Sequence, residues 1–112
     1  MKIYHNPRCR KSRDTLSIIE EKNIQVEIVE YLKDPITKKE LKQILRLLNI
    51  SAVELIRKGE SLYKEKFNKK DFSNDEWLDI ILKNPILIER PIVVKDNQAV
   101  IARPPEKVLN LF

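Results

Sequence analysis

The sequence predicts an α/β fold in which a four-stranded mixed sheet is interrupted by a helical insertion. Three observations support this prediction. Residues 2–31 follow a strand, helix, strand pattern, and residues 37–84 carry repeated helix-start signals. Residues 92–101 form two β-rich runs around a short polar segment.

The N-terminal part is predicted to form a βαβ unit. Lys2–Tyr4 is a short strand, and from Arg10 to about Lys22 apolar residues mix with charges at helical spacing. From Gln25 to Tyr31 apolar and polar residues alternate, which predicts a second strand with Val26 and Ile28 on one face. Two strands joined by a helix in this way are expected to be parallel.

The insertion, at about residues 37–84, is predicted to be helical. Thr37, Ser51 and Ser73 are each followed three positions later by glutamate, the capping-box pattern that opens a helix. The only glycine, Gly59, is expected to mark a bend. Asn84-Pro85 is expected to end the last helix of the insertion.

A hairpin and a final helix complete the predicted fold. The runs 92–94 and 99–101 flank residues 95–98, where Asp and Asn tolerate the positive φ of a tight turn. Residues 103–106 open a helix whose first turn suits proline. We expect this helix to pack on the sheet through Val108, Leu109 and Leu111.

The element order is that of a thioredoxin-like (glutaredoxin-like) fold with a helical insert. In such a fold a loop after the first strand, a helix N-terminus and a proline before the hairpin meet at one end of the sheet. Here those parts are residues 5–8, Cys9 and Pro91. We expect the chain to be a single domain, residues 1–112, and a monomer.

Composition narrows the class of protein. The chain is 42% hydrophobic and 35% charged, which is typical of a soluble globular domain. No apolar run suits a membrane span and no signal region opens the chain, so we expect a cytoplasmic protein with no membrane partner. One cysteine and one histidine cannot form an internal disulfide or a zinc-ligand set, so no bound metal is expected. The net charge of +5 favours anionic partners.

Cys9 is the centre of the predicted site. A helix N-terminus carries about half a positive charge and several unpaired amides, and both favour a thiolate over a thiol. Arg8, Arg10 and Arg13 bring further positive charge close to it in the sequence. The alternative is a lone cysteine that fills core space, but its neighbours here are basic residues and Pro7 rather than apolar side chains.

The surrounding residues allow more than one reading. Ser12 is expected to face the sulfur across the first helical turn and to donate a hydrogen bond to it. His5 either tunes the thiolate or hydrogen-bonds the loop backbone. The basic run at residues 8–13 also resembles a nucleic-acid patch, but acidic residues follow at once and no aromatic platform lies nearby. We therefore expect no nucleic-acid partner.

Three arginines are candidates for anion binding. Arg57 stands just before the lone glycine, Arg90 just before Pro91, and Arg103 just after the last predicted strand. Each taken alone is read most simply as a surface charge. Arg90 and Arg103, however, bracket the hairpin, which predicts that both lie near one edge of the sheet. Because arginine forks match tetrahedral oxyanions, a thiolate beside them suggests nucleophilic attack on a small oxyanion.

The sequence resembles the glutathione/glutaredoxin-coupled arsenate reductase family over essentially its whole length. Five segments carry the resemblance, in order and at family spacing: His5–Arg13, Glu30–Leu32, Leu55–Lys58, Glu89–Val94 and Ala102–Leu109. The resemblance implies a thioredoxin-like fold with a cis peptide bond before Pro91.

The resemblance also implies a reaction. Cys9 would attack arsenate, glutathione would attack the cysteine–arsenate adduct, glutaredoxin would remove the glutathione, and arsenite would leave. His5 and Ser12 match residues thought to lower the cysteine pKa. Glutathione as co-substrate and glutaredoxin as partner supply the electrons, so no bound cofactor is implied. The family's oxyanion-binding triad matches Arg57, Arg90 and Arg103.

One position departs from the family pattern. The well-characterised arsenate-resistance enzymes carry Gly-Thr between the cysteine and the serine, whereas this chain carries Arg10-Lys11, as a sister subgroup does. Larger basic side chains are expected to narrow the pocket or to favour a bigger anion. Two alternatives stay open: another monothiol-type thiol-disulfide reductase, and a regulator of the same fold that binds RNA polymerase. Such regulators often carry Cys-x-x-Cys, and Ser12 at the second position favours a reductase.

Overall fold

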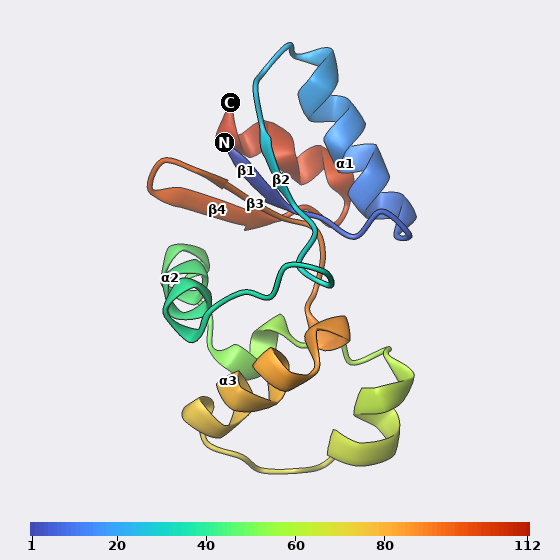
Figure 1. The fold of residues 1–112 in the computed structure, drawn as a ribbon, viewed down its shortest axis with the longest axis vertical. Helices are drawn as coiled ribbons and strands as arrows, with labels where there is room; N and C mark the ends of the chain where they lie inside the picture. The colour runs from blue at the N-terminus through green and yellow to red at the C-terminus, as the bar shows by residue number, and fades with distance from the viewer. The chain divides into compact units, whose positions relative to one another are not determined.

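The computed structural model describes all 112 residues, and the chain divides into two compact units (Figure 1). The first unit comprises Met1–Asp34 and Arg90–Phe112, and the second comprises Pro35–Glu89. The single-domain organisation of residues 1–112 stays a prediction.

The first unit contains the sheet. Its strands are β1 (Lys2–Tyr4), β2 (Glu27–Val29), β3 (Ile92–Lys95) and β4 (Gln98–Ile101), in the spatial order β2-β1-β3-β4. Strand β1 is parallel to β2 and antiparallel to β3, and β3 and β4 form the hairpin, with Asp96 at a φ of 55° in its turn. The predicted mixed four-stranded sheet is therefore confirmed.

Two helices cover one face of this sheet. Helix α1 (Arg10–Glu21) and the 3₁₀-helix η4 (Pro105–Leu111) lie side by side in Figure 1. Between these helices and the sheet lies an apolar core. Its buried residues are Ile3, Ile19, Val93, Ala102, Val108 and Leu111. This packing fixes the direction of α1, and with it the position of the helix N-terminus that follows β1.

One packing expectation for this unit is wrong. Leu109 is 43% exposed, because a 3₁₀-helix turns every three residues and so points Val108 and Leu111, but not Leu109, at the sheet. Ile28 is 47% exposed, although it pairs in register with the fully buried Ile3. The reason is that β2 is an edge strand, and of the two residues predicted to share a face only Val26 packs against the core.

The second unit is helical, as predicted for the insertion. It contains α2 (Lys38–Leu48), the 3₁₀-helix η1 (Ala52–Leu55), the π-helical turn η2 (Tyr63–Phe67), α3 (Asn74–Lys83) and the short η3 (Pro85–Leu87). No helix of either unit is long and apolar enough to cross a membrane.

The three predicted helix starts of this unit behave differently. Thr37 caps α2 by accepting a hydrogen bond from the Glu40 amide, and Ser73 forms a reciprocal capping box with Glu76 at the start of α3. Ser51 instead donates its hydroxyl to the Glu54 carboxylate, 3.1 Å away, and only the 3₁₀-helix η1 follows. Its box is therefore a side-chain pair rather than an α-helix cap.

Candidate active site

Cys9 occupies the N-cap position of α1, where its backbone is extended (φ −94°, ψ 122°). Its amide donates to the Asn6 carbonyl at 2.9 Å, and its carbonyl accepts from the Arg13 amide at 3.0 Å. The loop and the first helical turn thus hold the residue from both sides. The side chain is half-buried, and the first turn contains no acidic residue that would neutralise the positive end of the helix.

The surroundings of the sulfur favour the thiolate. Burial by itself raises the pKa of Cys9, but hydrogen bonds to the sulfur outweigh burial, and the pKa falls below its ordinary value. The amide of Ser12 and the side chain of Arg90 contribute most to this lowering, and the Arg103 side chain and the Lys11 amide add to it. The two amides are the N2 and N3 donors that a cap side chain faces. The sulfur closes no short cap bond with them, yet their N–H dipoles still stabilise a negative charge.

Two arginines converge at this sulfur from the two ends of the β3–β4 hairpin. Arg103 Nη1 lies 3.8 Å from Cys9 Sγ and also donates to the Arg90 carbonyl at 2.9 Å. Arg90 is only 6% exposed, so its charge is held inside the protein. The Arg90–Pro91 peptide bond is cis, and so is the Arg103–Pro104 bond, which sequence patterns did not indicate. Guanidinium groups placed in this way can hold an oxyanion against the thiolate.

His5 and Ser12 form a buried pair beneath the loop. His5 Nδ1 lies 2.6 Å from Ser12 Oγ, and the same oxygen accepts from the Asn6 amide at 3.1 Å. The Ser12 hydroxyl is therefore bound to the loop rather than to the sulfur, and Ser12 acts on Cys9 through its backbone amide. Burial lowers the pKa of His5, with Glu30 opposing and Arg13 reinforcing this shift, so the imidazole is neutral at neutral pH.

Asn6 is the residue of this loop that sequence reasoning missed. It is 5% exposed, and its side-chain Oδ1 accepts from the Arg8 amide at 3.0 Å. Its backbone amide and carbonyl bind Ser12 and Cys9, so Asn6 connects the buried pair to the sulfur-bearing residue. The signal was present, since an Asn-Pro pair marks a turn in which the asparagine side chain caps the backbone two residues on.

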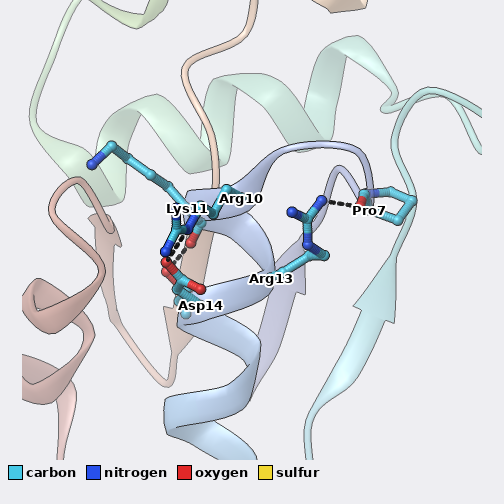
Figure 2. Close-up of polar contacts among 6 residues, drawn as sticks. Pro7, Arg10, Lys11, Arg13 and Asp14 are labelled. Atoms are coloured by element: carbon cyan, nitrogen blue, oxygen red, sulfur yellow. Dashed lines mark hydrogen bonds and ion pairs between the residues drawn. The ribbon is translucent and has the colours of Figure 1, made fainter.

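Two of the basic side chains that neighbour Cys9 in the sequence are bound to other partners (Figure 2). Arg10 Nε pairs with Asp14 Oδ2 at 3.9 Å, and Arg13 Nη1 donates to the Pro7 carbonyl at 3.0 Å. The expected pull of Arg10 and Arg13 on the sulfur is thus largely replaced by these contacts. Arg10 and Lys11 are both exposed, and Lys11 points away from Asp14, so neither side chain packs into the interior.

Arg57 belongs to the second unit. Its amide donates to the Leu87 carbonyl at 2.7 Å, beside the isolated bridge between Ile56 and Ile88, and the residue is partly exposed. This hydrogen bond fixes the backbone position from which the Arg57 side chain extends. Its part in the site stays a prediction.

The arrangement can perform nucleophilic thiol chemistry on an anion. A half-buried sulfur faces helix amides and two guanidinium groups that lower its pKa, and a neutral histidine supports the loop. No group of three or more His, Cys, Asp or Glu side chains is placed to hold a metal ion. The fold and this site define a thioredoxin-like protein with one reactive cysteine at a helix N-terminus.

Comparison with known proteins gives the family. The model of the ArsC family matches residues 4–111, and the chain belongs to this family. The uncharacterized protein YfgD of Escherichia coli K12 is 44% identical over 113 residues, covering 99% of this chain and 95% of YfgD. An arsenate reductase of Neisseria meningitidis serogroup A is 43% identical over 110 residues, covering 96% of this chain and 94% of the relative.

Solved structures agree. The arsenate reductase from Vibrio cholerae matches with a TM-score of 0.92 at 40% sequence identity, covering 100% of this chain and 98% of that one. The predicted thioredoxin-like fold and the resemblance seen in the five sequence segments are therefore confirmed.

Proposed function

We propose that this protein is an arsenate reductase in which the Cys9 thiolate attacks arsenate. The observation that carries the proposal is the sulfur at the α1 N-cap, whose pKa is lowered by the first-turn amides together with Arg90 and Arg103. Membership of the ArsC family, with relatives named arsenate reductase at about 40% identity, supplies the reaction.

In the first step the Cys9 sulfur forms a bond to arsenic and one arsenate oxygen leaves as water after protonation. Arg90 and Arg103 stabilise the negative oxygens of the adduct, because hydrogen bonds hold the Arg103 guanidinium and burial holds Arg90 before the substrate arrives. Arg57 is proposed as the third arginine that holds the oxyanion. His5 and Ser12 are positioning residues that hold the loop, and Pro91 borders Arg90 at the same edge.

The reduction needs two electrons, which two thiols supply when they join in a disulfide. One arsenate and two molecules of glutathione thus yield one arsenite, one glutathione disulfide and one water. The chain has a single cysteine, so the thiols must come from outside. Glutathione is the proposed co-substrate and glutaredoxin the proposed partner, with Cys9 regenerated as arsenite leaves. A monomer that works in the reducing cytoplasm suits this chemistry, and no bound metal or organic cofactor takes part.

The proposal is tested by arsenate-dependent oxidation of NADPH, coupled through glutathione reductase, glutathione and glutaredoxin. The unmodified protein should show this rate, and Cys9→Ser should reduce it to background. Reactions without arsenate and without glutaredoxin serve as controls. No arsenate-dependent rate with the unmodified, folded protein would overturn the proposal.

A second candidate is reduction of another anionic thiol substrate, such as a glutathionylated peptide. The exposed cations that neighbour Cys9 in the sequence favour this candidate, since they would attract an anionic substrate. The same coupled assay separates the two. Oxidation of NADPH with a glutathionylated peptide but not with arsenate would favour the second candidate.

A further inference from the structure

The loop that carries Cys9 contains four cationic side chains, and they fall into two classes. Arg10 is paired with Asp14, and Arg13 is bound to the Pro7 carbonyl. Arg8 and Lys11 are exposed, and neither side chain makes an ion pair or hydrogen bond within the protein. Only the backbones of these two residues are engaged, through the Arg8 amide and the Lys11 carbonyl.

These two uncommitted cations flank the reactive sulfur. Arg8 is one residue before Cys9 and Lys11 is two residues after it, on the first turn of α1. Two backbone contacts hold these residues in place. The Arg8 amide donates to Asn6 Oδ1, and the Lys11 carbonyl accepts from the Thr15 hydroxyl. A thiol that reaches Cys9 from solvent therefore approaches a segment that carries two exposed positive charges with no internal partner.

The chemistry of the proposed co-substrate matches this spacing. Glutathione carries its thiol on the central residue and a carboxylate on the residue at each end. Its two carboxylates thus lie on either side of the sulfur, each about one residue of chain away. A carboxylate gains a charge-assisted hydrogen bond from either a guanidinium or an ammonium group.

We propose that Arg8 and Lys11 form a subsite that binds the two carboxylates of glutathione while its sulfur reacts at Cys9. The inference rests on the proposed function, and it assigns a role to the basic loop in place of the expected narrowing of the pocket. An acidic face of a protein partner is the competing occupant. The free tripeptide fits better because the two charges lie within two residues of Cys9 in the sequence, whereas a protein partner needs a broad contact surface.

The test uses a reaction that needs no arsenate. Cys9 attacks one sulfur of glutathione disulfide, the disulfide bond breaks, a Cys9–glutathione mixed disulfide forms, and glutathione thiolate leaves. Mass spectrometry follows this reaction on the only cysteine of the chain. The rate constant is divided by that for the uncharged 2-hydroxyethyl disulfide, and the ratio cancels any change in the nucleophilicity of Cys9.

The unmodified protein should prefer glutathione disulfide, and Arg8→Gln/Lys11→Gln should lower the ratio by about five- to tenfold, as expected for two exposed ion pairs. The matched control is Lys22→Gln/Lys107→Gln, which removes the same charge at exposed sites of the same unit and should leave the ratio unchanged. High salt should reduce the preference of the unmodified protein but not the ratio of the loop variant.

Two results would overturn the subsite. One is an unchanged ratio of rate constants in the loop variant. The other is an equal fall in the control variant, which would mean that the overall positive charge of the protein, and not a local site, attracts glutathione disulfide. If the ratio is unchanged while the rate with glutaredoxin falls, the loop binds the protein partner instead. If the protein does not reduce arsenate but the loop variant shows the expected fall in the ratio, the proposed function is wrong and the glutathione subsite stands. The two failures are therefore distinguishable.

Discussion

Helices α1 and α3 begin in opposite ways. At the start of α3, Ser73 and Glu76 satisfy each other's backbone amides, and the hydrogen bonds from Ser73 lower the pKa of Glu76. Acidic residues fill that first turn. At the start of α1 the cap is Cys9, no side chain caps the amides, and the first turn carries Arg10 and Lys11 instead of acids.

The difference shows what each helix start is for. The start of α3 uses its amides and dipole for helix stability, as the rules for isolated helices predict. The start of α1 keeps the same amides and the same dipole available for the Cys9 sulfur. Capping and acidic side chains that would stabilise α1 are absent, as expected where a helix start serves the proposed active site.

The largest effect is expected from Cys9→Asp. Aspartate is a good N-cap and complements both the dipole and the nearby arginines, so the free energy of unfolding should rise by about 1 kcal/mol. Arsenate reductase activity should be lost completely because the nucleophile is gone. Urea unfolding and the coupled assay measure the two effects. Cys9→Ala, which neither caps nor reacts, should be inactive without the gain, and a gain in Cys9→Ala as well would count against the cap argument.

The next effect concerns the arginine of the helical unit. Arg57→Ala should lower kcat/KM for arsenate about ten- to a hundredfold, the cost of a lost charge-assisted hydrogen bond. The kinetic response to glutathione should change little. Lys58→Ala, which removes the neighbouring exposed charge, is the control. Arsenate kinetics like those of the unmodified protein would remove Arg57 from the site.

A smaller effect, on stability alone, is expected from Ser73→Ala. Loss of the cap should reduce the free energy of unfolding by about 1 kcal/mol. Fluorescence of Trp77, which lies on α3 and contacts Phe72, reports the transition in urea. Activity at a temperature where the variant is folded should be unchanged. A loss of activity in the folded variant would mean that the two helix starts are not separate in function.

The smallest effect is expected from His5→Asn, through the pH dependence of stability. Burial lowers the pKa of His5 below its ordinary 6.5, so below that pH the unfolded chain binds a proton that the folded chain does not. The unmodified protein should therefore lose stability as the pH falls below about 6.5, and the variant should lose less. Urea midpoints at two pH values measure the difference, and parallel losses would contradict a buried neutral His5.

The fold was largely predictable because its signals are local. The β1–α1–β2 order, the Ser73 box and the hairpin turn at Asp96 each follow from a few adjacent residues. Leu109 was placed wrongly, since its burial depends on a 3₁₀ rather than an α-helical turn, and Ile28 is exposed because its strand lies at the sheet edge. Local periodicity indicates neither feature.

The residues of the candidate site could be chosen from the sequence, but the contacts of their side chains could not be predicted. Cys9, Arg90 and Arg103 were chosen from a helix start and from the two ends of a hairpin, and the structure brings these three together. The spacing of residues in the sequence did not predict the directions in which their side chains point. Arg10 turns to Asp14, and the Ser12 hydroxyl turns to His5, because each finds a partner that sequence order does not reveal.

The pKa of Cys9 tests the central claim most directly. It can be measured from the ultraviolet absorbance of the thiolate, or from the pH dependence of alkylation, without interference from other thiols. We predict a pKa below the ordinary value of about 8.5, and a rise toward that value in Arg103→Ala because a donor to the sulfur is lost. A pKa at or above about 8.5 in the unmodified protein, or no change in the variant, would contradict the assignment of this helix start to the thiolate.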